Sequence, residues 1–191
     1  MTTAQNLEAT LGEFEGSSDV GSPQIPGSAR ASGDRLIVTA SGHNMWLEQD
    51  EFHFVWKRVE GDWSITARPE FVGDGANAHR KAVVLVRQSL DADSPYAGLA
   101  LHGDGLTSLQ YRSEKAGGTS EVRFTAANGP LQISLARAGG HVRASADDAE
   151  SHNVQLQLQG EYYIGLAVCS HVDDVAETVE FSDVRLEPIL D

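Results

Sequence analysis

The stretch Lys81–Arg112 has the sequence KAVVLVRQSLDADSPYAGLALHGDGLTSLQYR, the pattern of three short strands joined by two turns. Apolar residues alternate along each run, as expected when successive side chains point to opposite faces of a sheet. Asp91–Pro95 contains residues that favour tight backbone geometry, and Gly103–Gly105 supplies glycines for a hairpin. The stretch therefore predicts three antiparallel strands: Lys81–Leu90, Tyr96–His102 and a run that ends at Arg112.

One face of the last two predicted strands carries small and polar side chains. Its members are Gly98, Ala100, His102, Ser108, Gln110 and Arg112. The opposite face carries core residues, namely Leu99, Leu101, Leu109 and Tyr111. Arg87 joins the polar face if its strand has the matching register. Two interpretations stay open: a solvated outer face of a sandwich, or a concave face whose small residues leave room for a polar ligand.

Runs of strand length, separated by glycines, continue through the rest of the chain. Further strands are predicted at Arg35–Ala40, Asp62–Val72, Glu121–Ala126, Leu131–Ala136, His141–Ala146, Val154–Leu158, Glu161–His171 and Glu177–Glu187. Pro69 cannot donate to a ladder, so it predicts an edge position or a bulge in its strand. No long amphipathic helix and no repeat is seen. The pattern is typical of an all-β protein, a two-sheet antiparallel sandwich or jelly roll, with residues 1–10 as a tail or short helix and residues 11–191 as one domain.

Composition narrows the class of partner and the compartment. The 191 residues contain 14 Lys+Arg and 28 Asp+Glu, so the net charge is −14, which argues against nucleic acid or an anionic membrane as partner. No apolar run is long enough to insert into a bilayer. The N-terminus lacks the features of a signal peptide, which predicts a cytoplasmic protein. The single cysteine, Cys169, lies in an apolar run and is predicted to be a buried small residue.

Several motifs together resemble a known superfamily. They are SGHNMW at Ser41–Trp46, DEFHFVWK at Asp50–Lys57, GDWSITAR at Gly61–Arg68, the stretch Val86–Arg112, and YYIGLAVCSH at Tyr162–His171. With them the chain resembles bacterial domains of the concanavalin A-like lectin/glucanase superfamily, of the laminin-G-like, DUF1349-like kind. It looks especially like the domain next to β-propeller repeats in proteins labelled Tol-type biopolymer transporters. The resemblance implies a jelly roll whose concave face binds or sometimes hydrolyses carbohydrate, with calcium often at its rim.

The leading functional hypothesis is a non-catalytic carbohydrate-binding module. Polar side chains would exchange hydrogen bonds with sugar hydroxyls, and an exposed ring would stack on the apolar face of a sugar. Trp46 is preferred as that ring, because Trp56 shares the alternation of Phe52 and Phe54 and is predicted to lie in the core. The predicted ligand-binding set is Trp46, Arg87, His102, Gln110, Arg112 and His171.

Two other functions stay open. A glycoside hydrolase would need paired carboxylates, and its candidates are Glu48, Asp50 and Asp104; Glu48 and Asp50 share a strand face, but the third carboxylate of an ExDxxE signature is missing. A protein-interaction domain could instead form a homo-oligomer through exposed sheet edges. No histidine pattern predicts a transition metal and no cofactor is expected, although turn acids could supply oxygen ligands for calcium. Those acids are Asp91, Asp93, Asp147, Asp148, Asp173 and Asp174.

Overall fold

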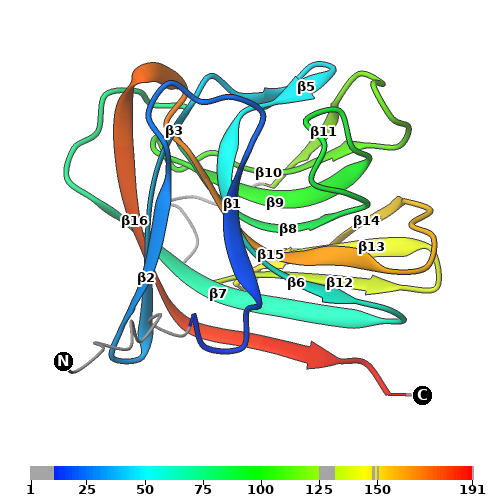
Figure 1. The fold of residues 1–191 in the computed structure, drawn as a ribbon. Helices are drawn as coiled ribbons and strands as arrows, with labels where there is room; N and C mark the ends of the chain where they lie inside the picture. The colour runs from blue at the N-terminus through cyan, green and yellow to red at the C-terminus, as the bar shows by residue number, and fades with distance from the viewer. Residues whose placement is uncertain (1–10, 125–131, 148, 150, 191) are drawn as a thin grey trace, which may run out of the picture.

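The computed structural model describes residues 11–124, 132–147, 149 and 151–190, and these fold into two seven-stranded antiparallel sheets (Figure 1). The first sheet has the order β1 (Gly16–Val20), β6 (Phe52–Val59), β15 (Tyr162–Cys169), β8 (Lys81–Arg87), β9 (Tyr96–His102), β10 (Thr107–Arg112) and β11 (Ser120–Arg123). The second has the order β14 (His152–Gln155), β13 (His141–Ala146), β12 (Ile133–Ala138), β7 (Trp63–Val72), β16 (Val172–Pro188), β3 (Arg35–Gly42) and β2 (Ser28–Ser32). A short hairpin of β4 (Met45–Trp46) and β5 (Gln49–Asp50) stands apart.

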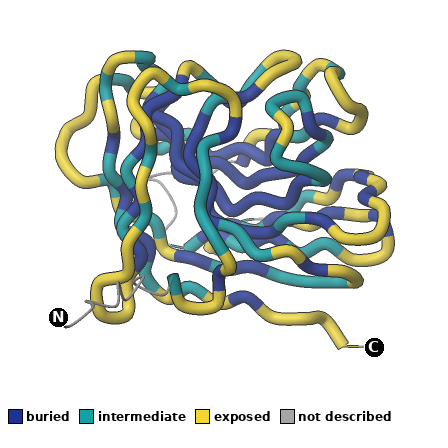
Figure 2. The backbone as a smooth tube through the Cα atoms, in the orientation of Figure 1, coloured by how far each residue is buried: buried dark blue, intermediate teal, exposed yellow. Residues whose placement is uncertain are grey.

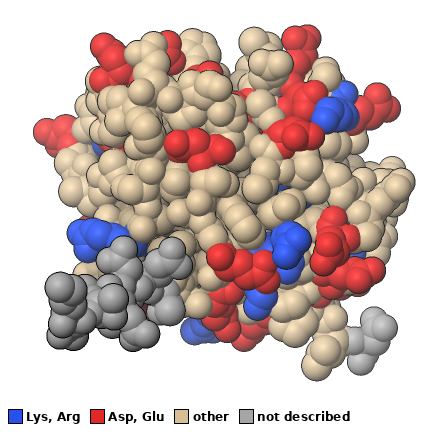
Figure 3. Space-filling view, in the orientation of Figure 1, with Lys and Arg blue, Asp and Glu red and all other residues tan. Residues whose placement is uncertain are grey.

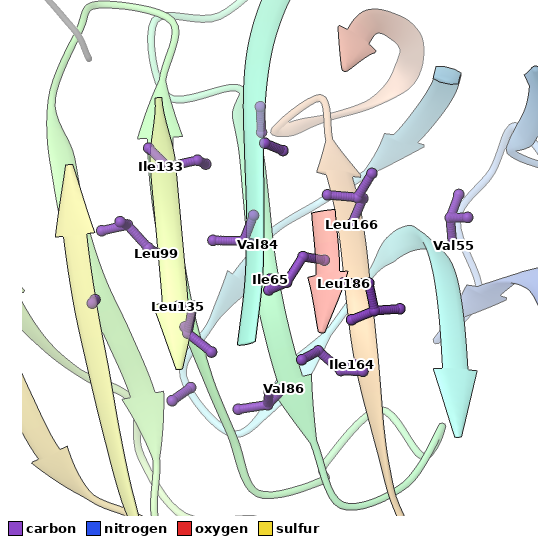
Figure 4. Packing of buried hydrophobic residues seen from close by; sticks show 14 of the residues in the cluster. Val55, Ile65, Val84, Val86, Leu99, Ile133, Leu135, Ile164, Leu166 and Leu186 are labelled. Atoms are coloured by element: carbon purple, nitrogen blue, oxygen red, sulfur yellow. The ribbon is translucent and has the colours of Figure 1, made fainter. Parts of the chain in front are cut away.

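The two sheets face each other across one apolar core. Each strand sends every second side chain inward, so residues from both sheets meet in the middle. Figure 4 shows this packing, with Val84 and Ile164 of the first sheet beside Ile65 and Leu186 of the second. In Figure 2 the buried backbone is concentrated in the strands of the first sheet. The predicted jelly-roll sandwich is therefore the observed architecture.

The central strands agree closely with the sequence prediction. The strand Tyr96–His102 has the predicted bounds, and the strand that begins at Lys81 ends at Arg87 rather than at Leu90. Leu99 and Leu109 are fully buried in the inter-sheet core, as their alternation predicts. The predicted tail at residues 1–10 lies outside the described residues.

Among the described residues, Pro69 in β7 has a ladder partner on one side. The last described pair of β7 and β12 is Ala67 with Ile133, and on the other side Pro69 lies opposite Phe181 of β16. The register of β7 and β16 also shifts between Ser182 and Arg185. This stretch of β7 thus lies next to a bulge, which agrees with one of the two placements predicted from the proline.

The charge of the surface and the hydropathy of the elements agree with the composition: the surface is predominantly acidic, as the net charge predicts. Acidic side chains outnumber basic ones over the chain, and Figure 3 shows groups of them on one face with basic groups between. Within the described part of the chain, no helix has the length and hydropathy needed to cross a membrane.

Candidate functional site

The register of the first sheet brings the predicted polar side chains onto one face. Arg87 lies opposite Tyr96, which lies opposite Arg112, and Gln110 lies opposite Gly98. This face turns away from the second sheet, because its apolar residues form a separate cluster drawn from the first sheet and the β4–β5 hairpin. We call it the outer face. Arg87 therefore has the register that places it with the polar set.

The β4–β5 hairpin covers one part of the outer face and buries an ion-pair cluster there. Arg112 Nη2 lies 2.8 Å from Asp50 Oδ1, and Arg87 Nη1 lies 3.5 Å from Asp50 Oδ2. All three side chains are 0% exposed. Arg112 also donates to main-chain carbonyls of Leu47, Ser94 and Gly117. Burial raises the pKa of Asp50, and the hydrogen bond from Arg112 opposes that rise.

This cluster corrects three of the sequence-based assignments. Arg87 and Arg112 neutralise a buried carboxylate and have no surface for a sugar, so the structure does not support them as ligand-binding residues. Asp50 is closed off from solvent in the same way and cannot act as an acid or nucleophile on a substrate. The sequence showed the residues but not the hairpin that covers them.

The small residues of this face do not leave room for a ligand. A Cβ on Gly98 would lie 2.8 Å from a Val83 methyl and 2.9 Å from a Leu85 methyl. Ala100 is 1% exposed and packs in the same apolar cluster. The space beside Gly98 and Ala100 is filled by neighbouring side chains. The interpretation that these small residues leave room for a polar ligand is therefore wrong.

A pocket of about 210 Å³ remains open beside the hairpin, next to the start of β8, the end of β9, and strands β10 and β11. We call it the outer pocket. It is lined by Asn44, Trp46, His79, Lys81, His102, Leu106, Gln110, Glu121, Arg123 and His171. Four of the six predicted ligand-binding residues are in this set, namely Trp46, His102, Gln110 and His171. The pocket is therefore the candidate site.

Histidines line one side of the outer pocket. The rings of His79 and His102 have centroids 6.1 Å apart, and those of His79 and His171 are 5.6 Å apart. His102 Nδ1 lies 2.9 Å from the carbonyl oxygen of Leu106, so Nδ1 carries the proton and Nε2 is left as an acceptor. Burial, reinforced by the charge of Lys81, lowers the pKa of His102 to about 4. Near neutral pH its ring is uncharged and offers the pocket one acceptor, Nε2.

Lys81 is one of the six lining residues that the predicted ligand-binding set lacked, and it is the most deeply buried cation among them. It lies directly opposite His102 in the ladder and is 2% exposed. Its ammonium donates to Asn44 Oδ1, and burial lowers its pKa. The signal was present, because a lysine that opens the apolar run KAVVLV shares a face with Val83 and Leu85 rather than lying in a turn.

The remaining carboxylates do not form a catalytic pair in the outer pocket. Glu48 is exposed between β4 and β5, and Asp104 is exposed in the turn after β9, where its Oδ1 accepts from the Leu106 amide. Neither lines the pocket. Glu121 does, and Arg123 Nε lies 2.6 Å from its Oε1. Hydrolysis by two opposed carboxyl groups needs two acids, whereas the lining of the outer pocket contains one, Glu121, which is paired with Arg123.

Three of the predicted turn acids contact basic or histidine side chains outside the outer pocket. Lys115 Nζ lies 2.8 Å from Asp91 and 3.3 Å from Asp93, and His43 Nδ1 lies 3.2 Å from Asp173. Across residues 11–124, 132–147, 149 and 151–190, no three acidic, histidine or cysteine side chains converge as metal ligands would. Asp148 lies outside the described residues.

The other aromatic and sulfur side chains are buried or partly buried. Tyr96 is 1% exposed and donates its hydroxyl to the Met45 carbonyl. Trp56 is partly buried and packs with Tyr163 on the outer face, with ring centroids 5.3 Å apart. It lies against the cluster that contains Phe52 and Phe54, whose alternation it shares, and not in the core between the two sheets. Cys169 is buried as predicted, and burial raises its pKa to about 11, which leaves the thiol protonated and unreactive.

Comparison with known proteins identifies the fold. No family model matches the chain, and no curated protein matches it. Among solved structures it is similar to a Saccharomyces cerevisiae protein of unknown function, with a TM-score of 0.65 and 16% identity over 86% of this chain and 93% of that one. It is similar to the carbohydrate-binding module CBM66 from Bacillus subtilis, with a TM-score of 0.53 and 15% identity over 92% and 97%.

A family 7 alginate lyase, A1-II′, is a further structural neighbour, with a TM-score of 0.56 and 9% identity over 84% of this chain and 83% of the lyase. At these identities the likeness concerns the fold, and one fold carries many functions. The neighbours agree with the concanavalin A-like jelly roll that the motifs imply.

Proposed function

We propose that this protein is a non-catalytic carbohydrate-binding module and that the outer pocket is its sugar site. The observation that supports the proposal most is the composition of the pocket. It joins one indole ring, Trp46, to neutral hydrogen-bonding groups, among them His102 at the end of β9 and Gln110 within β10. Binding sites for small molecules commonly combine a concave apolar surface with a few fixed polar groups.

The chemistry of a sugar fits these groups. Each hydroxyl can both donate and accept. Nε2 of the neutral His102 ring can accept from it, since Nδ1 already donates to the Leu106 carbonyl, and the Gln110 amide has an oxygen that accepts and a second N–H that donates. Gln110 is 4% exposed and donates to Ser108 Oγ, so its orientation is held before a ligand arrives. Groups that are already oriented lose little conformational entropy on binding.

Trp46 provides the apolar contact. It lies half-buried in β4, on a hairpin anchored beneath by Asp50 and Met45. Sugars expose C–H faces that pack on aromatic rings, and a ring held by a rigid hairpin can provide this contact. Sandwich folds with this architecture include the carbohydrate-binding module CBM66.

A glycan-binding screen of the purified protein, followed by titration calorimetry of the hits, tests the proposal. We expect Trp46→Ala and Gln110→Ala each to weaken binding by about tenfold or more, because each removes a contact made by a fixed group. The matched control is Gln49→Ala, which alters an exposed residue of the same hairpin outside the pocket and should bind as the parent protein does.

A screen with no hits from protein whose circular dichroism shows intact sheet would overturn the proposal. The screen is run once with calcium and once with a chelator, because the sequence predicts that acidic turn residues could bind calcium. The finer relationship, to laminin-G-like, DUF1349-like domains beside β-propellers, stays a prediction. We do not propose hydrolysis, because the outer pocket has one carboxylate among its lining residues and that group is paired with Arg123.

A further inference from the structure

Lys81 differs from the other buried cations in having no acidic partner. Arg87 and Arg112 share Asp50, and Arg80 Nη1 lies 2.8 Å from Glu177 Oε2. Lys81 is equally buried, at 2% exposed, yet its one hydrogen bond is to the neutral amide of Asn44 among the described residues. Among the described residues, three of these four buried cations are thus ion-paired, and Lys81 has no carboxylate within ion-pair distance.

An uncompensated buried ammonium is costly. Taking a charge out of water without a partner loses hydration energy that nothing returns, which is why buried charges are normally paired. A protein keeps such a group when something other than its own carboxylates meets it. Lys81 lines the outer pocket, so a ligand that enters there reaches it.

The surroundings of Lys81 favour an anion in the pocket. Two cations, Lys81 and Arg123, and one carboxylate, Glu121, line it, and the carboxylate is already 2.6 Å from Arg123. His102 is neutral near pH 7. The outer pocket therefore carries a net positive charge on a protein whose net charge is −14.

We propose that the outer pocket selects acidic sugars and that Lys81 binds their carboxylate, an inference that rests on the proposed function. An ammonium has three donors, and Asn44 takes one, so two remain for a ligand. A carboxylate on a sugar ring offers two oxygens to them and supplies the missing charge. The volume of about 210 Å³ suits one sugar residue, with Trp46 at its edge.

The ligand chemistry gives a direct test. Di- and trisaccharides of glucuronate, galacturonate, mannuronate and guluronate are titrated into the protein beside their methyl esters and their neutral parent sugars. The ester keeps the shape and removes the charge, so we expect at least one acidic oligosaccharide to bind about tenfold or more tightly than its own ester. The preference should weaken little at higher salt, because Lys81 is buried.

The variant Lys81→Met keeps an unbranched side chain one atom shorter than lysine and removes the ammonium. We expect it to bind the acid and the ester alike, whereas Lys115→Met, at an exposed lysine paired with Asp91, should keep the preference of the parent protein. If Lys81→Met does not fold, the comparison of acid and ester on the parent protein still decides whether the outer pocket prefers acidic sugars.

The outcomes separate this inference from the proposed function. Neutral sugars or esters that bind as well as the acids would overturn the acidic preference and leave carbohydrate binding in place. Retention of the preference by Lys81→Met would overturn the role of Lys81. A protein that binds no saccharide of either class would overturn both.

Discussion

Asp50 balances two buried arginines, so its side chain supports the covered part of the outer face. It is an acid of a two-residue strand and accepts from Arg112 through both oxygens, at 2.8 and 2.9 Å. Removing one member of a buried ion pair leaves an uncompensated charge, and here two guanidinium groups would lose their carboxylate. The same argument explains why Arg112 is unsuitable as a probe of sugar binding, since its loss would disturb the fold.

We expect Asp50→Asn to lower the free energy of unfolding by about 3–5 kcal/mol. Urea denaturation followed by circular dichroism measures the change. Glu48→Gln is the matched control, because it makes the same chemical change at an exposed position of the same hairpin, where a surface substitution should alter stability by about 0.5 kcal/mol or less. Equal stability of the two variants would show that the cluster contributes little.

His102 makes stability depend on pH. Its pKa falls from 6.5 to about 4 in the folded protein, first because it is buried and then because Lys81 and His79 face it, while Asp104 and the Leu106 carbonyl oppose the fall. Between pH 6.5 and about pH 4, His102 is therefore protonated in the unfolded chain and neutral in the folded protein. Stability is full above pH 6.5 and is lost as the pH falls toward 4, by up to about 3 kcal/mol.

Denaturant unfolding at several pH values between 7 and 4 checks this dependence. We expect His102→Gln to lose less stability over that range than the parent protein, whatever its stability at pH 7. His141→Gln, at an exposed histidine of β13, should follow the parent curve. Parallel curves for the parent protein and His102→Gln would contradict the role assigned to His102.

Strand β15 owes its central place in the first sheet to a glycine. It lies between β6 and β8, and Gly165 is opposite Trp56 on one side and Leu85 on the other. A Cβ at Gly165 would lie 1.9 Å from the Val55 carbonyl oxygen and 3.0 Å from the Trp56 Cα. Both are backbone atoms of a strand that is paired on both edges, so they cannot move aside cheaply.

We therefore expect Gly165→Ala to destabilise the protein by about 3 kcal/mol, the upper part of the usual range for overpacking. Gly118→Ala is the control, since a Cβ there meets no atom within 4 Å, and it should be nearly neutral. Thermal and urea unfolding of both variants measure the difference. A mild effect at Gly165 would mean that β6 can shift to accept the methyl group.

The short β4–β5 hairpin determines which part of the outer face is accessible to solvent. It converts the end of the outer face near Arg87 and Arg112 into a second, minor core with Met45, and it leaves the end near His102 open. The hairpin also carries Trp46 to the edge of that opening. One short element therefore both closes half of the outer face and forms a wall of the outer pocket.

In the molecule as a whole, local alternation was sufficient to predict the sandwich. Period-two patterning placed Leu99 and Leu109 in the core, and the turn residues gave the bounds of Tyr96–His102, because a residue's face in a strand depends only on its position in the run. The same reasoning brought His102 and Gln110 together in the outer pocket, since neighbours on one face of adjacent strands come together by register.

Folding of the distant chain segments settled the rest. Asp50 meets Arg87 and Arg112 across 37 and 62 residues, a pairing that no local pattern contains. The isolation of Lys81 likewise depends on which carboxylates other segments bring near it. Alternation specifies the face on which a side chain lies, but the charge that meets it and the access of solvent depend on long-range packing, and these two quantities separate a buried ion pair from a binding site.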